Sequence, residues 1–221
     1  MPTTLVAQVD SAYGGKTGVD LARAKNYVGA YHQPAGVLVD PLTLDTLPQV
    51  ELAAGWVEVL KTALIAGGSL WETLSQGGEV DEDTIFACVR AKLEVVAADE
   101  RDDGRRQVLN LGHTVGHAIE TVTGYGRYRH GEAVGLGLLA ALRLSQAPEL
   151  RARVRELLHA RGLPVSASGI STEAVLDAIA RDKKRIGADV PFVLVREPGA
   201  PRHGCPVGAD ELHAAVSELL S

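Results

Sequence analysis

The chain has 221 residues, enough for one large domain or two small ones, and 46% of them are hydrophobic, so it can bury a substantial core. The net charge is −6, and the lysines and arginines are scattered rather than gathered into a basic stripe, which argues against nucleic acid as a partner. Cys88 and Cys205 lie far apart, and no apolar run is long enough to span a bilayer. These features argue against a disulfide framework, a thiolate zinc site and a membrane protein, and we expect a cytoplasmic globular protein.

The first fifty residues predict pieces of an α/β layer. Short β-prone or apolar runs at 3–10 and 36–40 each end in an aspartate, and the Gly-rich turn "GGKTG" lies between them. Such runs are typical of a parallel sheet whose loops carry the ligand chemistry.

From Glu51 the spacing of apolar residues becomes helical. Glycines, prolines and Ser/Thr caps set the ends of the predicted helices, which cover about 51–66, 83–102, 107–122, 131–146, 148–161, 171–184 and 209–220. A lone strand is predicted at 190–195. Strands followed by helices predict a mostly α protein attached to a partial α/β layer.

Three histidines and one glutamate are candidates for a metal site. His113 and His117 are four residues apart in a predicted helix and therefore face the same way, although such a pair is more often a surface or hydrogen-bonded pair. His130 follows in "YRHGEAV", and Glu58 lies in the apolar "GWVEVLKTAL", where a buried carboxylate needs a partner. Lys61 offers that partner as an intrahelical ion pair, whereas Glu58 with two histidines would form a catalytic zinc site with an open fourth position. The spacing leaves open which two histidines are ligands.

Cationic side chains gather near the same segments. Lys92 interrupts an apolar helix, Arg106 precedes the histidine helix, Lys16 and Lys25 lie in the early loops, and "RDKKR" occupies 181–185. Each alone is typical of a solvated surface. Together with a metal they suit a small polyanionic substrate that carries hydroxyl, carboxylate or phosphate groups.

Six stretches, in order, resemble 3-dehydroquinate synthase over the chain from Pro2 to the C-terminus. They are "VDSAYGGKTGVD", "AKNYVGAYHQP", "LAAGWVEVLKTALI", "VVAADERDDGRRQVLNLGHTVGHAIE", "RHGEAVGLGL" and "RDKK". The resemblance implies an NAD- and metal-dependent carbon–oxygen lyase of the shikimate pathway, with zinc or cobalt as the metal. Such an enzyme converts 3-deoxy-D-arabino-heptulosonate 7-phosphate into 3-dehydroquinate and phosphate. The resemblance further implies an incomplete Rossmann-like NAD-binding domain at 1–50, an all-helical metal- and substrate-binding domain at 51–221, and a homodimer.

Carried over motif by motif, the resemblance implies a role for each of the polar residues named above and for several others. The implied metal ligands are Glu58, His113 and His130. The residues implied around the substrate hydroxyls and the metal are Asp10, Lys61, Lys92 and Asn110, with Arg106 as the partner of the substrate carboxylate. The implied phosphate-binding residues are Lys16, Asn26, His117 and one lysine of the pair Lys183 and Lys184. The implied NAD contacts are Thr3, Thr4, Lys25 and Thr46.

The chain departs from the family at its front. The family ordinarily has a longer N-terminal part, with a Gly-rich turn after a first strand and an acidic residue for the adenosine ribose, and neither is found here. We therefore expect about half of an NAD site, with a sheet edge and an apolar helix face left uncovered. The sequence is then a fragment of a longer protein, which we favour, or one piece of a split or fused protein, or a truncated inactive metal-binding paralogue.

Other functions share some of these features. A sugar phosphate cyclase of the aminodehydroquinate or aminocyclitol type would keep the metal ligands and change the phosphate and carboxylate contacts, and Arg106 with "GGKTG" favours dehydroquinate instead. Metal-dependent alcohol and glycerol dehydrogenases share the architecture but usually lack "NLGHTVGHAIE" together with "RDKK". A non-catalytic metal-binding or dimerisation module is the remaining alternative.

Overall fold

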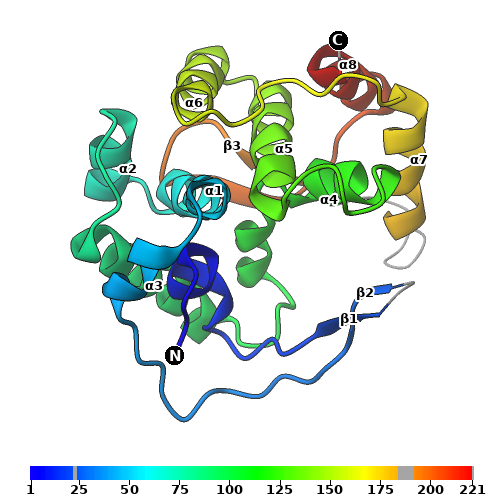
Figure 1. The fold of residues 1–221 in the computed structure, drawn as a ribbon. Coiled ribbons are helices and arrows are strands. Elements are labelled where there is room, and N and C mark those ends of the chain that lie inside the picture. Colours follow the sequence, from blue (N-terminus) through cyan, green and yellow to red (C-terminus); the bar gives the residue numbers. More distant parts are fainter. Residues whose placement is uncertain (22–23, 184–191, 221) are drawn as a thin grey trace.

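The computed structural model describes residues 1–21, 24–183 and 192–220, with the side chains of 20–27 and 182–183 outside the description. Helix α5 (His130–Leu144) runs through the middle of the helical part (Figure 1). The helices that pack around it are α1 (Gln49–Ala66), α4 (His113–Val122), α6 (Pro148–Ala160) and α8 (Ala209–Leu220). The helices farther from it are α2 (Gly68–Ser75), α3 (Glu82–Ala98) and α7 (Thr172–Lys183). None of the helices in the described ranges is both long and apolar enough to cross a membrane.

All seven predicted helices are confirmed, but two have different ends. The helix predicted over 83–102 ends at Ala98, because the Asp99 carboxylate accepts the backbone N–H of Asp103, Gly104 and Arg106 and turns the chain. The helix predicted over 107–122 begins only at His113. Residues 105–110 form a 3-10 helix, η3 (Arg105–Asn110), and a left-handed residue at 112 separates the two helices.

Helix α2 was not predicted, because a glycine pair was taken as the end of α1 alone. Gly67 has a φ of 67°, which reverses the chain, and α2 starts at Gly68 directly after it. A glycine pair thus joins two helices here instead of leading into a loop.

The centre of the helical part depends on two close approaches of α5 to its neighbours. A Cβ atom on Gly131 would lie 1.9 Å from the carbonyl oxygen of Ala54 in α1, and one on Gly137 would lie 1.9 Å from that of Gly112. Only glycine fits at these two positions. The first approach places the start of α5, including His130, directly beside the middle of α1.

The strands predicted in the first fifty residues were wrong. Residues 3–10 are largely helical, with a π-helical turn η1 (Ala7–Ser11), because Leu5 and Val9 are four residues apart and both are buried. The run 36–40 forms no strand and ends at Asp40, whose carboxylate caps the 3-10 helix η2 (Pro41–Thr46). The strands of this region are instead β1 (Val19–Leu21) and β2 (Ala24–Val28), which pair antiparallel.

The strand predicted at 190–195 is present but is not alone. It is β3 (Phe192–Val195), and it pairs antiparallel with the unpredicted β4 (Pro201–Cys205). The described ranges therefore hold two separate two-stranded antiparallel sheets and no parallel pair. The predicted mostly α fold class is confirmed, and the domain boundary near residue 50 stays a prediction.

Candidate metal centre

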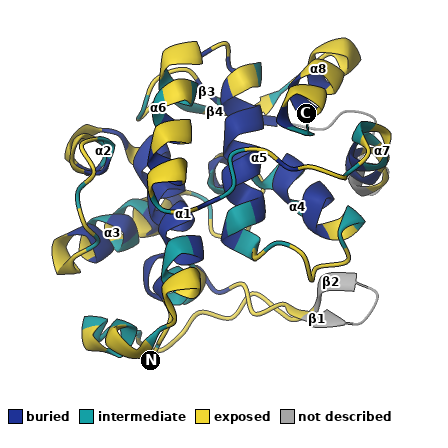
Figure 2. Cartoon of the chain, turned by 45° about the horizontal axis from the view of Figure 1, so that its top comes forward, coloured by how far each residue is buried: buried dark blue, intermediate teal, exposed yellow. Residues whose placement is uncertain are grey.

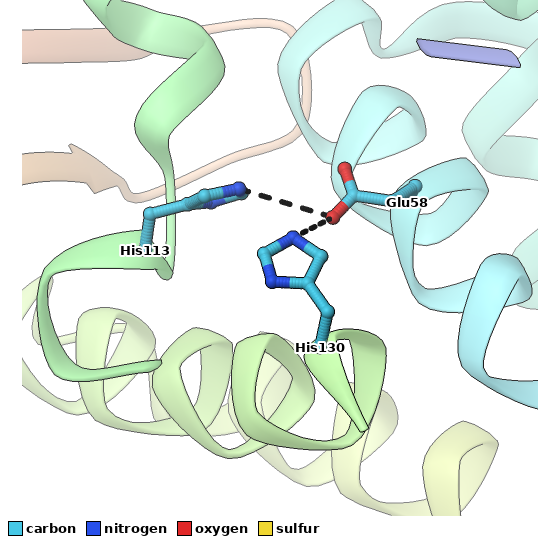
Figure 3. A group of neighbouring side chains, drawn as sticks. All are labelled: Glu58, His113 and His130. Atoms are coloured by element: carbon cyan, nitrogen blue, oxygen red, sulfur yellow. Dashed lines mark ion pairs between the residues drawn. The ribbon is translucent and has the colours of Figure 1, made fainter. Parts of the chain in front are cut away.

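Three predicted metal ligands from three different helices meet at one point (Figure 3). Glu58 lies in α1, and His113 and His130 are the first residues of α4 and α5. The Nε2 atoms of His113 and His130 lie 3.9 and 3.4 Å from the same atom, Glu58 Oε1. One donor atom from each residue lies within 4.8 Å of the other two.

The second nitrogen of each imidazole is occupied by an oxygen acceptor. Nδ1 of His113 is 3.1 Å from the carbonyl oxygen of Leu111, and Nδ1 of His130 is 3.2 Å from Glu120 Oε1. When each Nδ1 donates its hydrogen, each Nε2 presents a lone pair toward Glu58. Two lone pairs then face a carboxylate, an arrangement that a cation between them would stabilise.

The donor set fits a divalent zinc or cobalt ion. Glu58 is 1% exposed, and its Oε1 faces the Nε2 atoms of both histidines. Ligand atoms of one tetrahedral zinc ion lie about 3.3 Å apart, given metal–ligand distances of about 2.0–2.1 Å. The two measured separations, 3.4 and 3.9 Å, require little movement to reach that value.

The alternative partner for Glu58, Lys61, is also present. Its Nζ lies 2.6 Å from Glu58 Oε2 and 3.1 Å from Asp10 Oδ2. Nζ of Lys92 contacts Asp10 Oδ1 from the other side. The ion pair and the histidine cluster therefore use different oxygens of Glu58, and both interpretations of this glutamate are compatible.

Burial and neighbouring charges compete in this network. Burial raises the pKa of Glu58 and of Asp10, but the nearby ammonium groups, and for Glu58 the two histidines as well, outweigh burial and bring both below their usual values. Burial lowers the pKa of Lys61, but Asp10 and Glu58 outweigh it and raise the net value. Burial dominates for Lys92 and lowers its pKa. Both carboxylates are therefore charged at neutral pH.

The surroundings of the two histidines predicted as metal ligands favour different charges. Burial, followed by Lys61, lowers the pKa of His113 to about 3, so its imidazole is neutral. Burial also lowers the pKa of His130, but hydrogen bonds to Glu120 and Glu58 outweigh it and raise the value to about 9. The two carboxylates thus stabilise a positive charge, a proton or a metal ion, at the His130 ring.

His117 faces the same cluster, as predicted from the helical spacing. Its ring centroid is 5.1 Å from that of His113, and its Nε2 is 4.0 Å from Glu120 Oε2. Its side chain is 37% exposed, against 14% for His113. His117 is therefore more exposed than His113 and about as exposed as His130.

Glu120 was missed in the sequence. It is 4% exposed and follows His113 by seven residues and His117 by three. These intervals place it on the same helix face as both histidines. That spacing was the available signal.

Three other residues predicted to bind substrate, Arg106, Asn110 and Lys16, differ in burial and in hydrogen bonding. Arg106 is 2% exposed, its two Nη atoms donate to the carbonyl oxygens of Glu100 at 2.5 Å and Gly14 at 2.7 Å, and its Nε has no partner among the described residues. Asn110 is exposed, and Lys16 forms an ion pair with Asp102. These three roles stay predictions.

Three threonines of the predicted NAD contact are exposed. They are Thr3, Thr4 and Thr46. The hydroxyl of Thr4 accepts the N–H of Ala7, and that of Thr46 donates to the carbonyl of Thr43. The side chains of Lys25, Asn26 and Lys183, and all of Lys184, lie outside the described residues.

Comparison with protein families identifies the chain's relatives. The family model described as 3-dehydroquinate synthase N-terminal matches residues 1–54, and the one described as 3-dehydroquinate synthase C-terminal matches residues 55–185. The chain belongs to the 3-dehydroquinate synthase family. The family resemblance inferred from the six sequence stretches is thereby confirmed.

Individual members of the family are also similar to this chain in sequence. A 3-dehydroquinate synthase from Geobacter sp. (strain M21) is 40% identical, with 91% of this chain and 59% of the relative covered. One from Synechococcus sp. (strain CC9605) is 39% identical, with 99% of this chain and 63% of the relative covered. The chain thus spans about three fifths of the length of these relatives.

Two solved sugar phosphate cyclases have the same fold. The structure of 2-epi-5-epi-valiolone synthase from Streptomyces hygroscopicus subsp. jinggangensis 5008, with NAD+ and Zn2+ bound, has a TM-score of 0.88 and 26% identity, covering 99% of this chain and 64% of that one. The structure of 2-deoxy-scyllo-inosose synthase, complexed with carbaglucose-6-phosphate, NAD+ and Co2+, has a TM-score of 0.81 and 26% identity. This match covers 100% of the present chain and 66% of the 2-deoxy-scyllo-inosose synthase chain.

Proposed function

We propose that this chain carries the metal- and substrate-binding residues of a 3-dehydroquinate synthase. The reaction converts 3-deoxy-D-arabino-heptulosonate 7-phosphate into 3-dehydroquinate and inorganic phosphate, with a divalent metal and NAD as cofactors. The observation that carries the proposal is the meeting of Glu58, His113 and His130 at one carboxylate oxygen. Relatives named 3-dehydroquinate synthase are about 40% identical, whereas the two solved cyclases of other names are 26% identical.

The metal centre would be held by one carboxylate and two neutral imidazoles. A zinc or cobalt ion there supplies a Lewis acid that lowers the pKa of a bound substrate hydroxyl. Glu58, His113 and His130 leave the fourth position for substrate. His117 lies beside these three residues and is partly exposed, so it could contact a substrate held there.

Asp10, Lys61 and Lys92 form the polar wall beside this centre. The two ammonium groups donate to Asp10 in the present arrangement, and they can donate equally to substrate hydroxyls. The Asp10 carboxylate can accept a hydroxyl hydrogen, because Lys61 and Lys92 keep it charged. These three residues therefore orient the substrate hydroxyls.

His117 and Lys16 would bind the departing phosphate, and Arg106 the substrate carboxylate. His117 and Lys16 are both partly exposed and suit an anion that must enter and leave. Arg106 is buried, and its Nε has no hydrogen-bond partner in the described part of the chain. A guanidinium binds a carboxylate through two parallel hydrogen bonds. Binding would replace a backbone carbonyl on the guanidinium with the substrate oxygens.

The contribution of this chain to NAD binding is smaller. Thr3, Thr4 and Thr46 offer exposed hydroxyls, but the described residues contain no Gly-rich turn between a parallel strand and a helix, which is the usual cradle of the pyrophosphate. The described residues thus fit NAD only in part. We therefore derive no step through NAD.

Substrate binding tests the proposal. The zinc-loaded chain is titrated in a calorimeter with 3-deoxy-D-arabino-heptulosonate 7-phosphate, which carries a carboxylate, and with carbaglucose-6-phosphate, which does not. A charged hydrogen bond contributes about 1.5–3 kcal/mol, so we expect about 10–100-fold tighter binding of the acidic sugar. In Arg106→Lys this preference should be lost while zinc remains bound. Equal binding of both sugars by the wild-type chain would instead indicate a cyclase of neutral sugar phosphates.

Reaction products distinguish a cyclase from a dehydrogenase of the same architecture. A 3-dehydroquinate synthase releases phosphate from the acidic sugar with no net formation of NADH, because the cofactor is restored in each turnover. A dehydrogenase accumulates NADH and releases no phosphate. Simultaneous assays of phosphate and of absorbance from NADH would separate the two.

A further inference from the structure

Glu120 is a buried carboxylate to which the assignments above give no role. It is 4% exposed and lies on α4, on the helix face that carries His113 and His117. A carboxylate is costly to bury unless it is paired. Its partners therefore indicate why it is there.

The two oxygens of Glu120 face two imidazoles. Oε1 is 3.2 Å from Nδ1 of His130, a hydrogen-bond distance, and Oε2 is 4.0 Å from Nε2 of His117. On the other side of the His130 ring, Nε2 is 3.4 Å from Glu58 Oε1. His130 thus lies between two carboxylates, one on α4 and one on α1.

The orientation of His130 needs such a support. It is the first residue of α5, and its side chain is 36% exposed, against 14% for His113, so packing restrains its ring less. The other ligand, His113, is oriented by the neutral carbonyl of Leu111 at 3.1 Å. Only His130 has a charged acceptor behind it.

We propose that Glu120 is the positioning residue of the metal centre: it accepts the Nδ1 hydrogen of His130 and turns the Nε2 lone pair toward Glu58 Oε1. The inference rests on the metal centre of the proposed function. A carboxylate behind a metal-binding histidine fixes its tautomer and makes its free nitrogen a stronger ligand. Glu120 thereby fixes the ring orientation of His130, the more exposed ligand, as the Leu111 carbonyl does for His113.

The same atoms suggest a different role that must be separated from positioning. His117, Glu120 and His130 could themselves hold a second metal ion, because their donor atoms also lie within 4.8 Å of one another. His130 would then bind one ion through each nitrogen, which requires the loss of both ring hydrogens. A neutral imidazole keeps one of them, so the structure favours positioning.

The test uses the metal-free chain titrated with Co²⁺, whose visible absorption reports the ligand geometry. Affinity, ions bound per chain and Tm are measured for wild type, Glu120→Ala and Glu120→Gln. We expect Glu120→Ala to weaken Co²⁺ binding about 10–100-fold and to change the spectrum. Glu120→Gln should recover part of the affinity, because its amide oxygen can accept the same hydrogen bond. The control is Glu156→Gln, an exposed carboxylate on α6 paired with Arg153, which should bind like wild type.

The outcomes separate this inference from the function on which it rests. Wild-type affinity in Glu120→Ala, or an equal loss in Glu156→Gln, overturns the positioning role and leaves the metal centre intact. Two ions in wild type and one in Glu120→Ala overturn it in favour of a second metal site. A wild-type chain that binds no Co²⁺ removes the metal centre itself, and the inference with it. An affinity of Glu120→Gln no better than that of Glu120→Ala also counts against positioning. If Glu120→Ala lowers Tm so far that it cannot be titrated, Glu120→Gln decides: we expect it to bind Co²⁺ more weakly than wild type and Glu156→Gln, and an affinity and spectrum equal to those of wild type overturn the positioning role.

Discussion

The helical part, residues 49–220, and the N-terminal segment, residues 1–48, contribute to the site in different ways. In Figure 2 the central helices are largely buried, whereas much of the N-terminal segment is exposed. The predicted metal ligands all lie on helices, and their positions follow from close packing such as that of Gly131 on Ala54. The N-terminal segment supplies Asp10, which is tied to two lysines of the helical part, and Lys16, which is half exposed. Packing of the fold thus sets the arrangement of Glu58, His113 and His130, while the N-terminal segment contributes side chains that are more exposed than Glu58.

The largest expected difference between the two regions is in amide hydrogen exchange. Amides of residues 59–64 lie inside α1, and all six residues are buried. Amides of residues 36–39 form no backbone hydrogen bond within the described part of the chain. Because exchange from a core helix requires opening by several kcal/mol, we expect those of α1 to exchange at least about 10⁴-fold more slowly. Similar protection of both segments, measured by mass spectrometry, would mean that the N-terminal segment is as firmly held as the core.

The second expected effect is on zinc affinity. Replacing His113 by alanine should weaken zinc binding by more than the roughly 10–100-fold that loss of a supporting residue costs. His117→Ala and Lys16→Ala should keep zinc, and weaken the binding of phosphate-bearing ligands instead. Equilibrium dialysis with zinc and calorimetry with the substrate measure the two effects. Equal loss of zinc in His113→Ala and His117→Ala would contradict the division of roles between these histidines.

Glycine-to-alanine substitutions compare the packing of the two regions. In Gly131→Ala the new methyl group would overlap the carbonyl of Ala54, and overpacking costs about 1–3 kcal/mol. For a chain of this size that corresponds to a fall in Tm of about 2–4 °C per kcal/mol. Gly36→Ala is the matched control, because nothing lies within 4 Å of its Cβ position. A thermal melt in which both variants match wild type would show that α5 does not need its close approach to α1.

The smallest expected effect is on stability after loss of Lys16. Its side chain is 47% exposed in the ion pair with Asp102, and exposed ion pairs contribute about 0–1 kcal/mol. We therefore expect the free energy of unfolding of Lys16→Ala to be within about 0.5 kcal/mol of wild type. A larger loss in urea denaturation would mean that the loop of Lys16 supports the fold as well as the ligand.

The sequence predicted the helical part of the molecule better than the N-terminal segment. The helices were predictable because their signals are local: Pro148 begins α6, and residues 54–65, mostly apolar, are all buried in α1. The ligand set Glu58, His113 and His130 came from the family motifs, since spacing alone did not choose among the three histidines, and it stays a prediction. Their contact with Glu58 depends on helix packing that no local pattern encodes.

The errors have a common cause. In a short run, the spacing of Leu5 and Val9 is compatible with a strand or a helix. The segment is helical because both side chains are buried against the helical part, including α1. Strand β4 contains Arg202, His203 and Gly204, which do not favour strands, and it forms because β3 offers a partner. Glu120 was missed because a single glutamate on a helix is ordinary until its burial is known. In each case tertiary contacts, which are absent from a local pattern, determined the result.

Anomalous diffraction at the zinc edge, from crystals of the chain grown with zinc, tests the central claim most directly. The account predicts one peak per chain, within bonding distance of Glu58 Oε1 and of Nε2 of both His113 and His130. A peak bound through His117 in place of either histidine, or no peak near Glu58, would contradict it.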